Sequence, residues 1–251
     1  MMSDLLGWRK KFGVVTPSTN TIVQPEYDDM RPSGVTNHVA RMYIPDDPIK
    51  SDDDFNELIR RIDAALEDAV KSVMTCRPDH LVLGISSESI WGGGLEPSRR
   101  ILARIREQAV DIPVSQAADA LPAALGVLGV KRRISVITPY FQVADQHIRE
   151  YAAAIGYDVV RTCHLSRGSP VLIAHTPASQ LRQALMEVDG DDVEAIIQFG
   201  ANLPFGRQAA EAERWLEKPI IAVNVATYWH ALRTAGVADA VYGYGALLEH
   251  H

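Results

Sequence analysis

The strongest constraint on the fold is a long amphipathic segment that is followed directly by a continuously apolar one. Apolar side chains recur every three or four residues along 52–75, while Asp and Arg take the other face, which predicts a helix. Ser51 with Asp54 three residues later is typical of a capping box at its start. Residues 80–86 then form an apolar run of the kind that a parallel strand covered on both faces shows. The pattern predicts a unit of an α/β fold.

The rest of the chain repeats this alternation. Strands are predicted at 12–16, 35–44, 80–86, 112–115, 133–138, 157–163, 194–200 and 219–224. Helices are predicted near 52–75, 97–109, 119–129, 142–154, 177–188, 206–216 and 225–235. Strands that alternate with helices imply a mostly parallel sheet with helices on both faces, and so the α/β class.

The two halves of the chain resemble each other. Three pairs of segments occur in the same order in both halves: VVTP and VITP, LVLGI and IIQFG, and ALGVLGV and ALRTAGV. We interpret this as a duplication with pseudo-symmetric, flavodoxin-like repeats at 1–130 and 131–248, and residues 249–251 as the remnant of an affinity tag. Two such units facing one another place four loops around a shared cleft at the carboxyl ends of the strands, where open α/β sheets bind ligands.

Composition excludes several function classes. The chain has 251 residues and a formal net charge of −7, without a basic patch, which argues against nucleic-acid binding. It has no apolar run of membrane-span length and no signal-peptide core, so we expect a soluble cytoplasmic protein without a membrane partner. The scattered histidines and the two cysteines lack metal-ligand spacing, and no GxGxxG or GxxxxGK[ST] motif is present. We therefore expect neither a metal nor a dinucleotide.

Polar side chains follow the first predicted strand. Ser18, Thr19 and Asn20 lie in a loop whose hydroxyl, amide and backbone N–H groups suit a carboxylate ligand. The same residue types are ordinary helix caps, so a polar turn that starts the next helix explains the loop equally well. In the second half, Tyr140 follows the matching strand and could donate its phenol to the same ligand, or simply close the strand end.

Two further loops complete the predicted cleft. In the first, Ser86, Ser87 and Glu88 precede three glycines; Glu88 is an acid/base candidate if burial raises its pKa, or else a solvated loop residue. The other loop contains Gly200, Ala201 and Asn202, of which only Asn202 has a polar side chain. Three other polar or thiol side chains have a simpler structural explanation, as a helix cap or as small buried groups: Asn224, Cys76 and Cys163.

Four segments together resemble a known family. They are PSTNT, VARM, TPY and the closing PIIAVNVATYWHALRTAGV, and they are similar to the maleate cis–trans isomerase and arylmalonate decarboxylase group of the aspartate/glutamate racemase superfamily. The resemblance implies a duplicated α/β fold, a homo-oligomer (dimer or tetramer), no cofactor, and one or two loop cysteines whose thiolates act as nucleophile or proton carrier. It gives Ser18, Asn20 and Tyr140 the donor roles. The cysteine positions fall near Ile85-Ser86 and near Gly200, and neither is cysteine.

The missing cysteines shape the functional hypotheses. The leading one is a cofactor-independent lyase, isomerase or hydrolase that binds a small carboxylate between the halves, with Glu88, Ser86 and Tyr140 as catalytic groups. The predicted substrate-binding residues are Ser18, Thr19, Asn20, Ser87, Gly200, Ala201 and Asn202. A narrower alternative keeps the family's isomerase or decarboxylase reaction with serine in place of cysteine. Another alternative is a non-catalytic carboxylate-binding protein.

Overall fold

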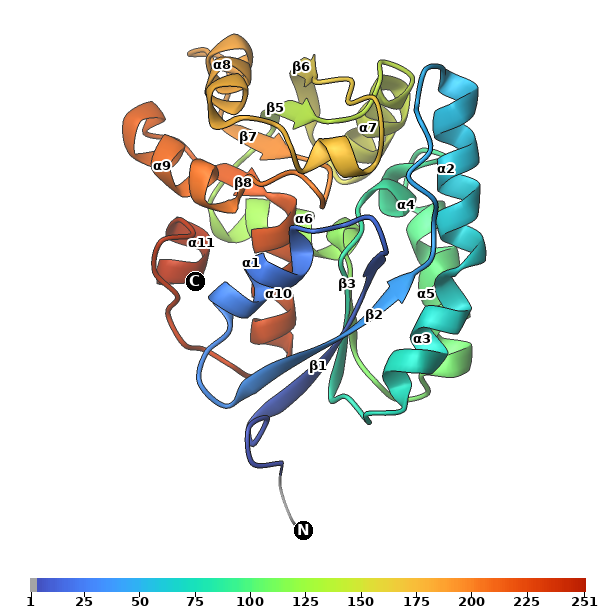
Figure 1. Cartoon of the computed structure of the whole chain (residues 1–251). Helices are drawn as coiled ribbons and strands as arrows, with labels where there is room; N and C mark the ends of the chain where they lie inside the picture. Colours follow the sequence, from blue (N-terminus) through green and yellow to red (C-terminus); the bar gives the residue numbers. More distant parts are fainter. Residues whose placement is uncertain (1–3) are drawn as a thin grey trace.

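The structure is a computed structural model that describes residues 4–251, apart from the side chains of residues 88 and 89. It contains two four-stranded parallel sheets, in the orders β2-β1-β3-β4 and β6-β5-β7-β8 (Figure 1). The first sheet consists of β1 (Lys10–Pro17), β2 (Val35–Met42), β3 (His80–Leu83) and β4 (Val114–Ser115). The second consists of β5 (Arg133–Thr138), β6 (Asp158–His164), β7 (Ala195–Gln198) and β8 (Ile220–Ala222).

All eight predicted strands form, and the α/β class is confirmed. Each sheet lies within one of the two predicted halves, although the exact division of the chain at residue 130 stays a prediction. Val14 of the central strand β1 pairs with Val39 on one side and Val82 on the other. Val14 and Val82 are fully buried, which agrees with a sheet covered on both faces.

The helices flank the sheets and connect their strands. They are α1 (Val23–Met30), α2 (Asp52–Ala64), α3 (Leu66–Met74), α4 (Ser87–Ile90), α5 (Glu96–Gln108), α6 (Ala117–Val127), α7 (Ala144–Ala154), α8 (Ala178–Val188), α9 (Gly206–Leu216), α10 (Val223–Thr234) and α11 (Ala246–His250), with a 3-10 turn η1 (Val171–Ile173). Three short helices, α1, α4 and α11, were not predicted because their apolar positions do not show a helical period over a long enough window.

The prediction of one helix over 52–75 was wrong. The chain forms two helices separated at Ala65, whose backbone (φ −95°, ψ 0°) leaves the helical region. The two helices differ in their contacts with the core. α2 joins both clusters, the larger one through Phe55 and Ile59 and the other through Ile62, whereas the buried residues of α3, such as Val70, join only the second. The predicted capping box is confirmed, because Asp54 N–H donates to Ser51 Oγ and the Asp54 carboxylate accepts from Ser51 N–H.

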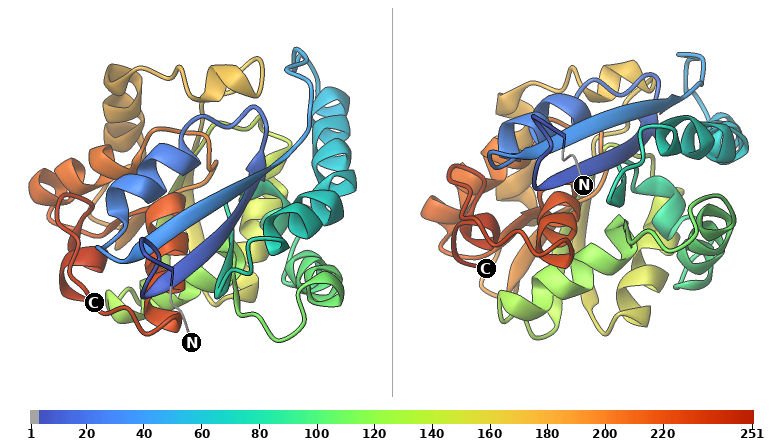
Figure 2. Two further views of the ribbon diagram at one scale, coloured as in Figure 1. Left: turned by 60° about the horizontal axis from the view of Figure 1, so that its bottom comes forward. Right: turned by 90° about the horizontal axis from the view of Figure 1, so that it is seen from below.

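The two halves interlock through their last helices. α10 comes from the second half but contacts β3 and β4 of the first sheet, and it packs along α6 (Figure 2). α10 begins at Val223 with Ala222 as its N-cap, so the expectation that Asn224 caps this helix was wrong. Asn224 lies in the first turn, where its amide donates to Glu26 at 2.7 Å and to the Ala201 carbonyl at 2.9 Å. The asparagine therefore joins segments of both halves.

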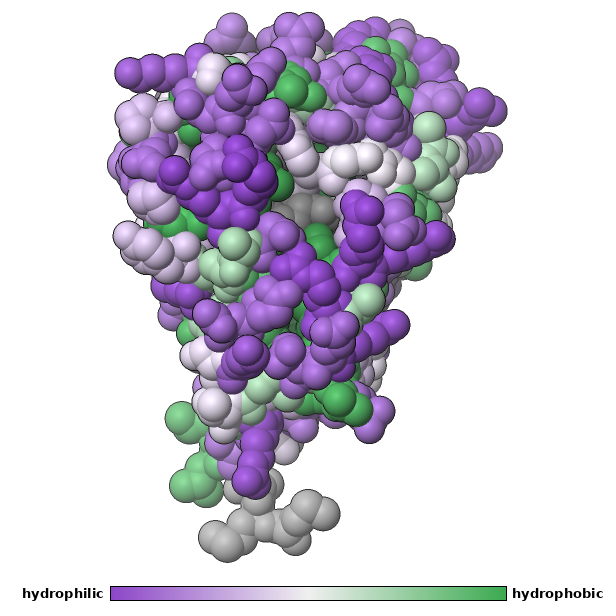
Figure 3. All heavy atoms as spheres, turned by 90° about the vertical axis from the view of Figure 1, so that its right-hand side faces the viewer, coloured by the Kyte–Doolittle hydropathy of each residue, from purple (hydrophilic) through white to green (hydrophobic). Residues whose placement is uncertain are grey.

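The outer face over α2, α3 and α5 is predominantly hydrophilic, with only small separate apolar areas (Figure 3). This agrees with the Asp- and Arg-rich outer face expected for the 52–75 segment. Along residues 4–251, none of the helices has the length and apolar character needed to cross a bilayer.

Candidate active site

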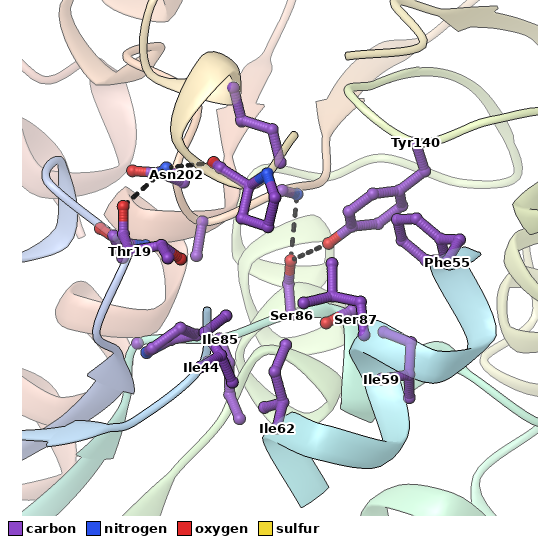
Figure 4. Close-up of a pocket in the computed structure, with 18 residues that line it drawn as sticks. Thr19, Ile44, Phe55, Ile59, Ile62, Ile85, Ser86, Ser87, Tyr140 and Asn202 are labelled. Carbon is purple, nitrogen blue, oxygen red and sulfur yellow. Dashed lines mark hydrogen bonds between the residues drawn. The ribbon is translucent and has the colours of Figure 1, made fainter. Parts of the chain in front are cut away.

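A small cavity lies between the two halves, at the carboxyl ends of the parallel strands (Figure 4). Its volume is about 60 Å³, which limits an occupant to a few heavy atoms unless the surrounding loops open. The lining residues come from the loops after β1, β2, β3, β5 and β7, from the turn near η1 and from α2. They are Pro17, Thr19, Asn20, Ile44, Phe55, Leu58, Ile59, Ile62, Gly84, Ile85, Ser86, Ser87, Tyr140, Pro170, Ile173, Gly200, Ala201 and Asn202.

Ser86 is at the centre of the polar part of the cavity. It follows β3, is 1% exposed, and accepts a hydrogen bond at Oγ from Gly200 N–H at 3.0 Å. Its hydroxyl also lies 3.1 Å from the Tyr140 phenol, and either oxygen of this pair can be the donor. One side chain of the first half thus contacts two residues of the second, and the predicted meeting of Ser86, Tyr140 and Gly200 is what the geometry shows (Figure 4).

Tyr140 is held in place from two sides. Its backbone N–H donates to Thr138 Oγ1 at 3.3 Å, directly after the end of β5. Its ring packs on Phe55 of α2, with 5.1 Å between ring centroids, and only 5% of the residue is exposed. A rotation of the phenol away from Ser86 would disturb the packing of its ring on Phe55, so this packing helps to hold the hydroxyl pair in place.

The loop after β1 has mainly a positioning role in this structure. Asn20 Oδ1 accepts from the N–H groups of Ile22 and Val23 at 2.9 Å each, so its side chain organises the entry to α1. Ser18 Oγ is bonded to both backbone groups of Ile44, and Ser18 is not among the residues that line the cavity. Thr19 lines the cavity, and no bond occupies its hydroxyl among the described contacts.

Asn202 connects three loops. Its Oδ1 accepts from Thr21 N–H at 2.9 Å, and its amide donates to the carbonyls of Pro170 at 2.9 Å and Thr19 at 3.4 Å. This amide is therefore largely used within the protein. By contrast, the backbone N–H groups of Thr19, Ala201 and Asn202 have no acceptor within the described part of the chain, and all three residues line the cavity. Such free N–H groups are suitable donors to a carboxylate.

The opposite wall of the cavity is apolar, and sequence reasoning missed it. Phe55, Ile59 and Ile62 project from α2 toward the polar loops (Figure 4). The helical period of these residues was visible in the sequence, but it predicted only a buried face and did not show that part of this face borders a cavity. Gly92, Gly93 and Gly94, which follow Ser86 and Ser87 in the same loop, are absent from the described lining.

Neither position expected for a loop cysteine carries a thiol. Ile85 occupies the first and is 4% exposed. At the second, Gly200 has φ +98°, and a Cβ there would lie 2.3 and 2.4 Å from two carbons of the Pro139 ring. The two cysteines lie outside the cavity lining, and burial raises the pKa of Cys76 and raises that of Cys163 to about 11. Both thiols are therefore poor nucleophiles at neutral pH.

The catalytic prediction for Glu88 falls on a side chain outside the described residues. Its backbone belongs to α4, which starts at Ser87. Among the side chains that the structure describes, no group of three or more His, Cys, Asp or Glu could hold a metal ion.

Similarity to known proteins identifies the family of this chain. A profile of the arylmalonate decarboxylase family matches residues 51–248, more than half of the chain. The chain belongs to the arylmalonate decarboxylase family. Curated relatives of this family member include the maleate isomerases of Alcaligenes faecalis, 24% identical over 95% of this chain and 96% of that protein, and of Pseudomonas putida, 27% identical over 95% and 97%.

Solved structures share the fold of this arylmalonate decarboxylase family member. The maleate cis–trans isomerase of Nocardia farcinica bound to TRIS matches with a TM-score of 0.85 and 22% identity, over 96% of this chain and 98% of that one. A liganded double mutant of arylmalonate decarboxylase matches with a TM-score of 0.79 and 18% identity, over 96% and 100%. These comparisons confirm the family resemblance seen in the sequence.

Proposed function

We propose that this member of the arylmalonate decarboxylase family is a cofactor-independent enzyme that acts on a small carboxylate in the cavity, without a thiol. The observation that carries the proposal is the buried hydroxyl pair of Ser86 and Tyr140. Ser86 lies at the first expected cysteine position, and its Oγ accepts from the N–H of Gly200, the second expected position. A covalently bound succinylcysteine intermediate is present in a variant of the Nocardia farcinica isomerase, whereas no cysteine lines the described cavity here.

The carboxylate would bind on the polar side of the cavity. Its donors would be the free N–H groups of Thr19, Ala201 and Asn202, together with the hydroxyls of Thr19 and Ser87. Ser18 and Asn20, predicted as direct donors, would instead hold the loop that presents Thr19, because their side chains are bonded within the protein.

The same donors would stabilise the transition state. Loss of a proton or of CO₂ next to a carboxylate places negative charge on its oxygens, and a positioned donor at such an oxygen contributes about 3 kcal/mol. The Ser86–Tyr140 pair adds two hydroxyl groups to the polar side of the cavity, where they can orient a bound molecule. Glu88, two residues after Ser86, is the proposed base, because a serine or tyrosine hydroxyl alone is a weak base at neutral pH.

The names of the relatives indicate two broad reaction classes for the proposed enzyme. Isomerisation and decarboxylation are the activities that their names record, and hydrolysis is a further possibility raised by the sequence. A narrower version of the proposal uses Ser86 as a nucleophile in place of cysteine. This version requires an alkoxide, which is much harder to generate than a thiolate.

The test is proton NMR in D₂O with a panel of maleate, malonate, amino-acid and N-acyl carboxylates. We expect turnover or deuterium exchange on at least one member, and its loss in Glu88→Gln. Full activity of Glu88→Gln would remove Glu88 from the mechanism while leaving the proposed site in place.

A second candidate function is carboxylate binding without catalysis. The closed backbone at Gly200, which excludes a side chain, favours it, because the site has lost a position that could carry a thiol. Line broadening of some panel members without turnover or exchange would support this function. Turnover of any member would exclude it.

A further inference from the structure

A tight turn after β7 carries one of the backbone N–H groups that border the cavity. The Gly200 carbonyl accepts from Leu203 N–H at 2.9 Å, so residues 200–203 form a hydrogen-bonded β-turn with Ala201 and Asn202 at its centre. Both central residues line the cavity, and the Asn202 N–H has no acceptor within the described protein. The peptide bond between them is trans, so its carbonyl and its N–H point in opposite directions. The orientation of this peptide group therefore decides which of the two faces the cavity.

A β-turn can hold its central peptide group in two orientations. Type I and type II turns differ by a flip of this peptide group, and the type II form requires a positive φ at the third residue. Asn202 occupies the third position and is not among the described residues with a positive φ, which excludes the type II form here. Asparagine nevertheless tolerates a positive φ better than most residues, so the residue type alone does not prevent the flip.

A buried amide on α10 holds the orientation that the turn has. Asn224 is 3% exposed, and its NH₂ group donates to the Ala201 carbonyl at 2.9 Å and to Glu26 Oε2 at 2.7 Å. Because both partners are oxygens, the nitrogen of the amide must face them. Asn224 is absent from the described lining, so the Ala201 carbonyl points away from the cavity and the Asn202 N–H points to the opposite side. After a flip, this N–H would face the NH₂ group, and two donors would oppose each other.

Glu26 in turn holds the amide of Asn224. It lies in α1 of the first half, and its other oxygen, Oε1, accepts at 3.1 Å from the N–H of Gly206, the first residue of α9. The neighbouring cation, Arg207, is paired with Asp29 instead. A side chain of the first half is thus connected, through Asn224, to a peptide group of the second half at the cavity.

We infer that Asn224 and Glu26 are positioning residues of the site, which hold the Ala201–Asn202 peptide group so that its N–H is available to a bound carboxylate. This inference rests on the proposed function, because it assumes that a carboxylate binds on the polar side of the cavity. Neither positioning residue is part of the described lining, so both act through the orientation of the peptide group rather than by contact with the ligand.

Asn224→Ala removes the NH₂ group and tests the inference first without a ligand. The ¹³C chemical shifts of Ala201 and Asn202 report their backbone torsion angles, and in the variant we expect them to move from type I values toward those of type II. Maleate and malonate are the probes for binding. In the wild type, the bound probe should shift the Asn202 amide resonance. In the variant this shift should be lost, the Thr19 amide should still respond, and Kd should rise about tenfold.

Thr227→Val is the matched control. Thr227 is buried one turn further along α10, where its hydroxyl donates to the Val223 carbonyl at 2.8 Å. The control loses a buried hydrogen bond of α10 but keeps the contact with Ala201, so its turn should be unchanged and its Kd should stay within about twofold.

Two milder variants keep the test decisive if Asn224→Ala does not fold. The single hydroxyl proton of Asn224→Ser can serve only one of the two acceptors, and Glu26→Gln keeps one oxygen for two donors. Both should change the torsion angles and Kd in the same direction as Asn224→Ala, by smaller factors.

The outcomes separate the inference from the proposed function. Unchanged torsion angles in the folded variants of Asn224, or a flipped peptide group with unchanged affinity, would make the inference wrong while the proposed function stands. An equal loss of affinity in Thr227→Val would assign the effect to a general loosening of α10 and would also refute the inference. If no carboxylate of the panel binds to the folded wild-type protein, the proposed function is wrong, and the inference is wrong with it.

Discussion

Replacing Gly200 by alanine tests whether the second cysteine position is closed by the backbone itself. Gly200 has φ +98°, where an L-residue is strained, and an added Cβ would lie 2.3 and 2.4 Å from carbons of the Pro139 ring. Left-handed backbone costs about 1–2 kcal/mol, and overpacking against a rigid neighbour costs about 1–3 kcal/mol more. We therefore expect Gly200→Ala to lower the free energy of unfolding by about 3 kcal/mol.

The matched control is Gly129→Ala. Gly129 also has a positive φ, +71°, but nothing lies within 4 Å of an added Cβ, so only the backbone strain of about 1 kcal/mol applies. In thermal unfolding followed by circular dichroism, Gly200→Ala should lower Tm by about 6–12 °C, and Gly129→Ala by about 2–4 °C. Equal shifts would show that Pro139 moves aside freely. The second position could then accept a cysteine, and the argument for its closure would fail.

Three further predictions concern the site and the buried titratable groups. Ser86→Ala leaves the buried Gly200 N–H without its acceptor, so it should cost about 2 kcal/mol of stability and at least a hundredfold in kcat; Ser87→Ala, whose hydroxyl has no bond within the described protein, should cost less than about 0.5 kcal/mol of stability. Burial raises the pKa of Glu26 from 4.5 to about 7, so the stability that its protonated form contributes is complete below about pH 4.5 and is lost as the pH rises to about 7. Urea titrations across this range should show the loss in the wild type and not in Glu26→Gln. Burial lowers the pKa of His80 from 6.5 to about 4, so the stability of its neutral form is present above pH 6.5 and is lost as the pH falls toward 4. His80→Phe should flatten this acid limb, and an unchanged limb would assign it to another group.

The sequence allowed prediction of the sheet framework because strand patterns are local. Continuous apolar runs such as 80–86 are typical of strands covered on both faces, and the structure contains a strand that overlaps each predicted range. The break at Ala65 could not be predicted from α2 and α3 themselves, because both continue one helical period. Of the two helices, α2 alone also packs against the larger core cluster, and such packing is a tertiary property that a local pattern does not record.

At the site, the residue types of the loops predicted which side chains lie at the cavity better than they predicted what each side chain does there. Thr19, Ser86, Tyr140 and Asn202 come together at the cavity, as expected from loops at the carboxyl ends of strands. Their hydrogen-bond partners come from distant segments, as for Asn202 with Thr21, and no local pattern records such pairs. The α2 wall was missed for a related reason: an apolar helix face looks the same in sequence whether it meets other side chains or a ligand.

The most direct test of a thiol-free reaction is the activity of a chain without cysteine. The double variant Cys76→Ala/Cys163→Ala removes both thiols of the sequence, and neither lines the described cavity. Proton NMR in D₂O, with whichever carboxylate the wild-type protein turns over, should give the same rate for the variant within about twofold once both proteins are shown to be folded. A loss of turnover in the folded variant would mean that a thiol takes part in the reaction, and the assignment of the chemistry to Ser86, Tyr140 and Glu88 would be wrong.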